Sequence, residues 1–419
     1  MIIKSHASEK GQAIVFLVVG LVVFLGFVAL AIDGGMAYAD RRYAQNSSDA
    51  ASLAGGGEAA LYLENNEVKY SSWDCNDPDV VYAEGIAITE AIQRAANNGF
   101  SIDGDIGDGN GVVVACGATD YGFFVDKYMD VTVNISTTTE TSFAHLLFPE
   151  VLHIQVHATT RIRPRQPWVL GNSVVALNPE NCSGHQNGGV YYGNGNVFVS
   201  GGGIWTNGCL QGNGRPSIIV DPGGIAYGGD FDPGNASWSP EPPPDPTGYH
   251  IPPSQYAIDP PNCTGRWVDG LNGTIDPGLY CLHGDLRVNA NHELVGHDVT
   301  IYVEGDIVLN GSALIQLSAP DSNPDPAPAL GGVLFYIPHM PGANCADQTF
   351  DMNGNSDSYF QGIILAPCAD ITVNGTGNVN AYQTQIIGWN VLVGGTADTS
   401  VIFNREIFEL RPTYIELFR

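Results

Sequence analysis

The sequence predicts an α+β protein with three successive parts: an N-terminal membrane-spanning helix, a small α/β module, and a large, mainly-β domain. Three observations predict this organisation. Twenty consecutive uncharged residues occupy 13–32, an amphipathic helical pattern covers 79–98, and from residue 166 short β-branched runs alternate with Gly and Asn turns. The 419 residues also include 52 Gly and 26 Pro, which is typical of a turn-rich β protein.

Composition limits the partners of the chain. Its 16 Lys and Arg face 44 Asp and Glu, a formal net charge of −28. Such a surface repels a phosphate backbone, so we expect no nucleic-acid partner. A hydrophobic content of 44% argues against wholesale disorder. The sequence contains no nucleophile elbow, P-loop or dinucleotide-binding glycine motif, and we expect a protein that is not an enzyme.

The first predicted element is the apolar segment 13–32, AIVFLVVGLVVFLGFVALAI, which contains no charge. A helix of this length spans a hydrocarbon core of about 30 Å. A secretory signal peptide would have an apolar core of about 7–15 residues and a small-residue cleavage site. Here the run is longer and continues into helix-forming sequence at 33–55. We therefore favour an uncleaved transmembrane anchor with a short cytoplasmic tail, 1–12.

All eight cysteines follow this anchor, and no C-x-x-C pair occurs, which disfavours zinc and thioredoxin-like sites. Shorter and longer gaps between them alternate, so neighbours are expected to pair. The predicted bridges are Cys75–Cys116, Cys182–Cys209, Cys263–Cys281 and Cys345–Cys368. The alternative is that some thiols are free and buried. Four bridges indicate an oxidising exterior, and hence an N-terminus inside and a large domain at the cell surface.

The next part, 33–165, reads as a small α/β module. A helix is predicted over Asp79–Asn98, ended by Gly99. Val80, Ala83, Ala87, Ala91 and Ala95 share one of its faces. Alternating apolar and polar residues predict three strands of one sheet at Val112–Cys116, Tyr128–Ile135 and His153–Ile162. A short helix is expected between the last two strands, in SFAHLLFPE (142–150).

The third part, 166–404, lacks helical periodicity. Short strands recur about 8–12 residues apart between Gly/Asn turns, which indicates a many-stranded solenoid, sandwich or barrel. An irregular parallel β-helix is our first interpretation and a β-sandwich the alternative. The proline-rich stretch 239–262 is expected as a surface excursion, because proline cannot donate to a ladder. Residues 405–419 are expected to form a C-terminal tail.

Several N-terminal residues carry a family resemblance. Lys10-Gly11-Gln12 before the apolar helix, Asp33-Gly34-Gly35 with Tyr38, and the DAASLAGG run resemble the N-terminus of the TadE/TadG-like Flp pilus-assembly proteins. The region 166–404 is similar to the Gly/Asn-rich β-helical ectodomains of many TadG-like members. The resemblance implies a bitopic, pilin-like membrane protein that supports pilus assembly or adhesion. Its implied partners are membrane lipid through 13–32, other pilin-like or Tad-system proteins, and copies of itself.

One residue departs from the pattern of cleaved pilins. Prepilins usually carry Glu at the fifth position after the cleavage-site glycine. If Gly11 is taken as that glycine, the fifth position is occupied by Phe16 instead of Glu. The resemblance therefore implies a membrane-retained, pilus-associated protein better than a bulk filament subunit. A filament-forming subunit stays an alternative, as does an anchored polysaccharide-binding or polysaccharide-degrading protein.

The sharpest polar cluster in the sequence is an acidic, glycine-rich loop. Asp103, Asp105, Asp108 and Asn110 are hard oxygen ligands at short spacing, which suits Ca²⁺. The spacing differs from an EF-hand, and the competing interpretation is a plain acidic loop.

Other side chains could also bind ligands. A polysaccharide-degrading site would draw on carboxylates among 285–306, although such side chains more often lie on solvated faces. Arg161, Arg163 and Arg165 alternate along a predicted strand, either as a solvated face or as a docking site for acidic partners. Tryptophans offer sugar platforms, although core packing is their commoner use. The candidates are Trp205, Trp238, Trp267 and Trp389.

Overall fold

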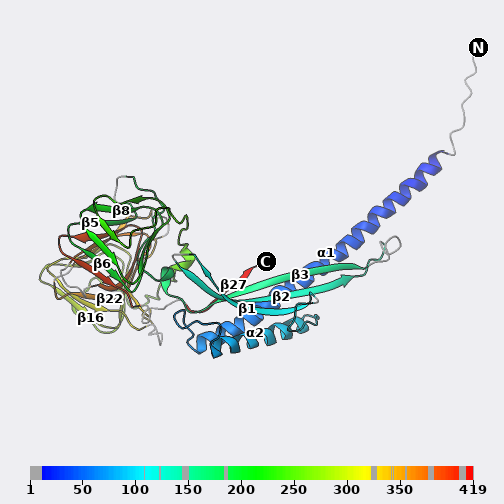
Figure 1. Ribbon diagram of the computed structural model, residues 1–419, viewed down its shortest axis with the longest axis horizontal. Helices are drawn as coiled ribbons and strands as arrows, with labels where there is room; N and C mark the ends of the chain where they lie inside the picture. Colours follow the sequence, from blue (N-terminus) through cyan, green and yellow to red (C-terminus); the bar gives the residue numbers. More distant parts are fainter. Residues whose placement is uncertain are drawn as a thin grey trace, which may run out of the picture. The chain divides into compact units, whose positions relative to one another are not determined.

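The computed structural model describes residues 12–418 except 108, 122–123, 144–150, 184–186, 322–327, 341, 343, 354–355, 376–381 and 405–411. The chain forms two compact units (Figure 1). Unit 1 comprises 1–119, 126–164 and 413–419, and unit 2 comprises 120–125 and 165–412. The second unit is thus an insertion in the first, a division that the sequence analysis did not indicate.

Unit 1 is built on one continuous helix. Helix α1 runs over Gln12–Asn65 and α2 over Pro78–Asn97. Helix α2 begins one residue before the predicted Asp79, because Asp77 caps it by accepting a hydrogen bond from the Asp79 N–H and Pro78 fits the first turn. Its buried side chains are the five predicted ones, Val80, Ala83, Ala87, Ala91 and Ala95. These small residues allow α2 to lie close against α1.

A four-stranded sheet completes unit 1 in the order β1-β2-β3-β27. The strands are β1 (Gly111–Asp120), β2 (Val125–Thr139), β3 (Leu152–Arg163) and β27 (Tyr414–Phe418). The three predicted strands are confirmed, each with longer bounds. Alternation sends Met129, Val131, Val133 and Ile135 into the core shared with the helices.

The end of the chain differs from the expected tail. Residues 414–418 form β27, which pairs antiparallel with β3, from Tyr414 opposite Arg163 to Phe418 opposite Thr159. The expected tail of 405–419 was wrong at these positions, because their alternation is too short to distinguish a strand from a tail. Residues 405–411 lie outside the described part, as does most of the short helix expected at 142–150.

Unit 2 is a large stack of short strands with two single-turn 3₁₀ segments, η2 (Trp168–Gly171) and η3 (Pro253–Gln255). Its first strands are β4 (Asn172–Ala176), β5 (Gly189–Gly193), β6 (Val197–Ser200), β7 (Gly203–Thr206), β8 (Leu210–Gly214), β9 (Ser217–Val220), β10 (Ile225–Tyr227), β11 (Phe231–Asp232) and β12 (Ser237–Ser239). The middle group comprises β13 (Gly273–Thr274), β14 (Gly278–Leu282), β15 (Leu286–Val288), β16 (Glu293–Gly296), β17 (Val299–Val303), β18 (Ile307–Leu309) and β19 (Leu314–Ser318). The last group comprises β20 (Val333–Tyr336), β21 (Gln348–Met352), β22 (Tyr359–Ala366), β23 (Ala369–Asn374), β24 (Tyr382–Gly388), β25 (Val391–Gly395) and β26 (Thr399–Ile402).

Every strand pair whose register is described in unit 2 is parallel. Paired residues such as Gly189 with Leu210, Leu286 with Ile307, and Gly278 with Val299 lie 21 positions apart in the sequence. Consecutive strands therefore pass to different sheets, and each strand pairs with one in the next layer of the stack. The large buried cluster inside includes Leu210, Ile307, Phe350 and Ile371. The coarse expectation of a mainly-β domain after a small α/β module is confirmed.

The order of the stack differs from the order of the chain. One sheet runs β12-β9-β6-β26-β24-β22-β19-β16-β13, and the other runs β11-β8-β5-β25-β23-β21-β18-β15. The first strands of unit 2 therefore lie in the middle, paired with the last, as in Val391 opposite Gly189 and Thr399 opposite Val197. Consequently, the chain enters and leaves this unit at neighbouring layers.

The proline-rich stretch 239–262 connects the two ends of the stack and packs along it. Ile251 is buried in a second apolar cluster with Trp205 and Tyr336. The Asn207 side chain binds its backbone: Oδ1 accepts from the Ile251 N–H at 2.8 Å. The Tyr336 hydroxyl donates to the Ile258 carbonyl at 3.2 Å. Beyond Ser239, the last residue of β12, this connection contributes no strand, as expected, yet it closes over part of the core.

Candidate functional site

The N-terminal half of α1 carries an apolar surface that nothing within unit 1 covers. Every side chain from Ile14 to Val28 is exposed, with Phe16 at 74% and Leu17 at 69%. It is the one helix among the described residues that is long and apolar enough to cross a membrane, with a mean hydropathy of 3.1 in its best window. Since burying apolar area is the dominant favourable term in association, an exposed apolar surface of this extent is typical of a membrane or protein interaction site.

Helix α1 changes character where the apolar segment ends. Asp33 is 4% exposed and accepts hydrogen bonds from the backbone N–H groups of Ser142 and Phe143. Further along, the Ser48 hydroxyl donates to the Val133 carbonyl at 2.7 Å. Ser48 is thus satisfied by β2 and Asp33 by the segment that follows β2, and together they fix the rotation of α1 against the sheet.

Three consecutive glycines bring α1 close to its neighbours. A Cβ on Gly55 would lie 2.4 Å from the Ala87 carbonyl oxygen of α2. A Cβ on Gly56 would meet the Thr160 methyl of β3 at 2.5 Å, whereas one on Gly57 would meet nothing. The glycine run therefore includes two positions that set the spacing of helix and sheet.

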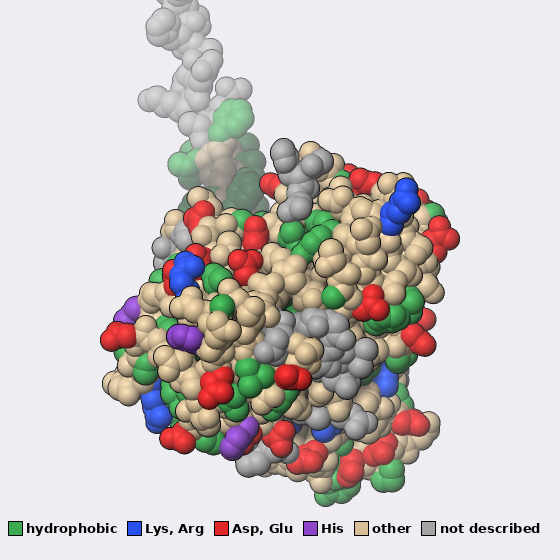
Figure 2. Space-filling model, turned by 90° about the vertical axis from the view of Figure 1, so that its left-hand side faces the viewer, with side chains coloured by type: hydrophobic (Ala, Val, Ile, Leu, Met, Phe, Trp, Pro, Cys, Tyr) green, Lys and Arg blue, Asp and Glu red, His purple; other side chains and the backbone are tan. Residues whose placement is uncertain are grey.

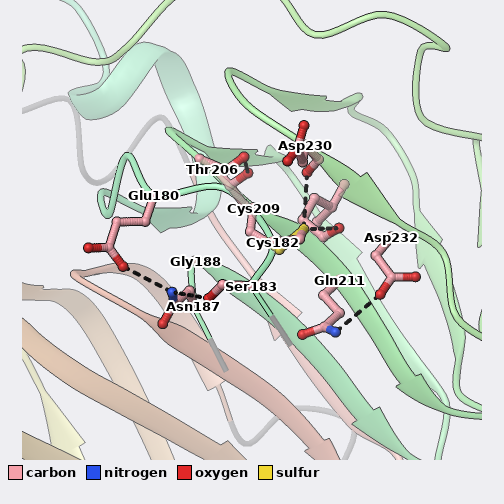
Figure 3. The surroundings of a disulfide bond; sticks show 12 residues. Glu180, Cys182, Ser183, Asn187, Gly188, Thr206, Cys209, Gln211, Asp230 and Asp232 are labelled. Atoms are coloured by element: carbon pink, nitrogen blue, oxygen red, sulfur yellow. Dashed lines mark hydrogen bonds between the residues drawn. A yellow bond between two sulfur atoms is a disulfide. The ribbon is translucent and has the colours of Figure 1, made fainter. Parts of the chain in front are cut away.

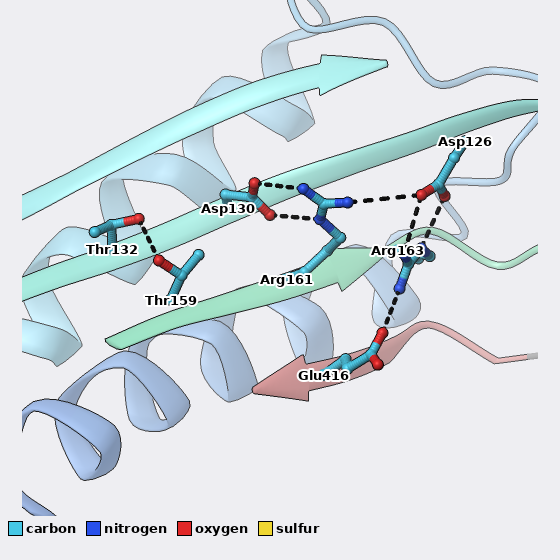
Figure 4. Close-up of polar contacts among 7 residues, drawn as sticks. All are labelled: Asp126, Asp130, Thr132, Thr159, Arg161, Arg163 and Glu416. Atoms are coloured by element: carbon cyan, nitrogen blue, oxygen red, sulfur yellow. Dashed lines mark hydrogen bonds and ion pairs between the residues drawn. The ribbon is translucent and has the colours of Figure 1, made fainter. Parts of the chain in front are cut away.

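The strand arginines are engaged within unit 1 (Figure 4). Arg161 donates two hydrogen bonds of 2.8 Å to Asp130 on β2. Arg163 donates hydrogen bonds of 2.8 and 3.0 Å to Asp126 and one of 2.9 Å to Glu416 on β27. The bonds to Asp130 raise the pKa of Arg161.

The docking interpretation of the three arginines is therefore wrong for the two on the strand. Their bidentate geometry occupies the groups that an acidic partner would need. The two guanidiniums instead tie β27 and β2 to β3. Arg165 lies beyond the end of β3 and belongs to unit 2.

The structure forms all four predicted disulfides, and no free cysteine occurs among the described residues. Cys75–Cys116 ties the loop before α2 to β1, and the other three lie in unit 2. Around Cys182–Cys209, shown in Figure 3, Asn187 donates to Glu180 at 3.0 Å and to Ser183 at 3.1 Å.

His339, Cys345 and Cys368 also lie within metal-binding distance of one another. The two sulfurs are bonded to each other, so they supply no thiolate.

The acidic loop predicted as a calcium site uses its oxygens locally. Asp103 accepts from the Asp105 N–H at 2.8 Å, and Asp105 accepts from the Gly107 N–H at 2.9 Å. Asn110 bridges the loop to Ser101 and to Ser136 on β2. Asp108 lies outside the described residues. The close-set carboxylates act as turn acceptors, and calcium binding stays a prediction.

The surface of unit 2 carries its carboxylates in scattered pairs. Asp285 binds Arg287 at 2.8 Å, and Glu304 binds His283 Nδ1 at 2.7 Å. In Figure 2, acidic side chains are spread over this face with few basic ones between them. Hydrogen bonding to Arg287 lowers the pKa of Asp285. A carboxylate with a lowered pKa is ionised at neutral pH, which makes Asp285 a poor general acid.

Among the tryptophans proposed as sugar platforms, Trp267 is the exposed one, at 38%, and its ring stacks on His283 at a centroid distance of 3.4 Å. Trp205 is fully buried, while Trp238 and Trp389 pack against the two apolar clusters. The commoner use of tryptophan, core packing, holds for these three.

The geometry of α1 agrees with a comparison of the sequence with protein families. Residues 11–60 match the family model described as putative Flp pilus-assembly TadE/G-like. The match covers the exposed apolar half of α1 and most of the half that packs in unit 1. This match confirms the resemblance to TadE/TadG-like proteins that the residues from Lys10 to the DAASLAGG run indicated. No curated protein and no solved structure matches the chain.

The sequence analysis missed several residues that organise these surfaces. Asp33 and Asn207 are single polar residues with no local motif, and their partners lie far away in the sequence. Asp126 and Asp130 could have been found, because their spacing of four residues places both on one face of β2, as the spacing of two places Arg161 and Arg163 on one face of β3. Only the sheet register joins the two sets.

Proposed function

We propose that this protein is a non-enzymatic, membrane-anchored component of a Flp-type pilus system, held by α1 and displaying its two folded units at the cell surface. One observation carries the proposal: a single helix passes without a break from a fully exposed apolar half to a half buried under α2 and the sheet. A helix built in this way can anchor a folded unit to a membrane. The TadE/G-like match over 11–60 connects this anchor with pilus assembly.

Unit 2 is, in this proposal, a rigid β-helical display domain. Its parallel pairing at a separation of 21 residues supports a coil that contributes one strand to each of several faces. Parallel sheets need both faces covered, and the side chains inside together with the 239–262 connection supply that cover. Loops at the coil corners are then free to contact an adhesion target.

The disulfides support the orientation. Bridges of this number persist in an oxidising compartment, so the units after α1 belong outside and residues 1–12 inside. The acidic surface, with its formal charge of −28, keeps the displayed part soluble. Beside the exposed Trp267, Glu304 is bound to His283 at 2.7 Å, and Asp285 is bound to Arg287 at 2.8 Å. Carboxylates engaged in this way favour display over polysaccharide cleavage.

Membrane fractionation of the full chain tests the anchor. In the double variant Val22→Arg/Val23→Arg, two charges lie at the centre of the span, each costing about 2.5–3.5 kcal/mol. The matched control is Tyr38→Arg, an exposed position beyond the apolar segment. The parent and the control should float with membranes after an alkaline wash, and the double variant should not. Equal flotation of all three would refute the anchor.

The pilus role has a separate test. Filaments are sheared from a host with an intact Tad system, and the chain is located by mass spectrometry and electron microscopy. The proposal predicts that the bulk of it remains with the membranes and is cross-linked to pilus components. Its recovery as the main constituent of filaments, beginning after Gly11, would instead establish a processed pilin subunit.

A further inference from the structure

The hairpin of β2 and β3 ends beside the point where α1 leaves the folded unit. Two contacts fix this position: the Thr139 hydroxyl donates to Asp40 at 2.7 Å, and the Ser142 N–H donates to Asp33 at 2.8 Å. Seven helical residues rise about 10 Å, as do three residues of strand. The end of β2 therefore runs antiparallel along α1, in keeping with the course of the hairpin in Figure 1.

This end of the hairpin is level with the end of the apolar segment. Asp33 directly follows Ile32, the last residue of the predicted span. The side chains from 14 to 28 are exposed, but Ala29 is half-buried, on the same helix face as Asp33. The folded unit thus begins to cover α1 one turn inside the apolar segment.

The exposed side chains include apolar ones at one end of the hairpin. At positions farther from Asp33 they are polar, as at Ser136 and Gln155. Next to Asp33 they include the polar Glu140 and Ser142, but also three apolar ones: Phe143 is 43% exposed, Val151 43% and Leu152 46%. Apolar exposure on this hairpin is therefore concentrated where the helix would enter a bilayer.

We propose that Phe143, Val151 and Leu152 form a second membrane contact, entering the boundary between headgroups and acyl chains beside α1. The inference rests on the proposed anchor, since α1 sets the depth and direction of the bilayer. Aromatic and branched apolar side chains are favoured at that depth. With two contacts at one level, the folded unit is held at a defined tilt on the membrane, where a helix alone would permit rotation.

Depth-dependent quenching tests the contact in the full chain. We would reconstitute the parent, Leu152→Trp and Ser136→Trp in phosphatidylcholine vesicles whose acyl chains carry bromine near the headgroup. Ser136 is exposed on the same hairpin, and it lies opposite Gln155, three residues or about 10 Å farther along the strand than Leu152. After subtraction of the parent emission, bromine should reduce the added emission of Trp at 152 roughly twofold and leave that at 136 unchanged.

Flotation of the same vesicles separates the two proposals. If the protein does not float, the anchor fails and the hairpin contact fails with it. If it floats and the Trp at 152 is not quenched, the anchor stands and the hairpin contact is refuted, as it would be if this surface binds another protein. Equal quenching at 152 and 136 would refute it too, because the hairpin would then lie flat.

Discussion

The glycine run of α1 offers a matched series of substitutions that tests how the buried half of the helix packs. Gly55, Gly56 and Gly57 follow one another, yet their surroundings differ: the α2 backbone, a β3 side chain, and open space. Alanine adds the same methyl group at each position. The helix propensity gained, about 1 kcal/mol, is also the same. Differences among the three variants therefore measure the local packing.

The structure sets the expected magnitudes. At Gly57 nothing opposes the gain, so Gly57→Ala should stabilise unit 1 by about 1 kcal/mol. At Gly55 the new Cβ would lie 2.4 Å from a backbone oxygen, where ordinary contact begins at 3.4 Å. The two helices must then separate by about 1 Å, and overpacking of this kind costs about 1–3 kcal/mol. Gly55→Ala should therefore be about 2 kcal/mol less stable than Gly57→Ala.

Native-state hydrogen exchange of the full chain in detergent reads this difference directly. The α2 amides around Ala87 report the separation of the helices. A difference of 2 kcal/mol corresponds to exchange about 30-fold faster in Gly55→Ala than in Gly57→Ala. Gly56→Ala should fall between them, because the Thr160 side chain can move at the expense of its 3.0 Å hydrogen bond to Ser52. Equal protection in the Gly55 and Gly57 variants would refute the close packing of α1 on α2.

Three further predictions concern the units separately. Replacing Cys75 and Cys116 with Ser should lower the stability of unit 1 by about 2–4 kcal/mol, measured by urea unfolding, because the bridge closes a long loop; an unchanged midpoint would contradict this. Asn207→Ala leaves buried donors unpaired, at about 1–3 kcal/mol each, and should expose 239–262 to proteolysis; an uncut segment would count against its packing. Burial raises the pKa of Asp370 above 3.8, so its contribution to stability is full below that pH and lost as pH rises through the folded pKa. In Asp370→Asn, the free energy of unfolding should fall less above about pH 4 than it does in the parent. An unchanged pH dependence of stability would show that the pKa of Asp370 is not raised.

Local patterns predicted unit 1 well. The alanine face of α2 repeats with helical periodicity, and the alternation on β2 and β3 extends over enough residues to identify both strands. The disulfides followed from the spacing of the cysteines, since each bridge joins sequence neighbours. In these cases the information lies within a few dozen residues.

Long-range pairing was beyond the sequence pattern. The 21-residue repeat of unit 2 is marked in the sequence only by a short motif, since Asp285-Leu286-x-Val288-Asn289 recurs 21 positions later as Asp306-Ile307-x-Leu309-Asn310, and the sequence analysis missed it. The pairing of β5 with β25 joins residues about 200 positions apart, and that of β27 with β3 about 250. Nothing in a strand of five residues specifies such a partner.

The candidate sites show the same division. The sequence placed the apolar surface of α1, because composition alone determines it. It could not decide between a free and a paired state for Arg161 and Arg163, since that depends on Asp126 and Asp130 across the sheet. Nor could it indicate that Asp33 ties the hairpin to the end of the span.

The central claim is that α1 anchors the chain and both folded units lie outside. Protease protection in intact spheroplasts tests it most directly, with one epitope placed before Gln12 and one after Phe418. External protease should remove the C-terminal epitope and leave a short, membrane-protected N-terminal fragment. If both epitopes survive until the spheroplasts are lysed, the units lie inside and the account is wrong.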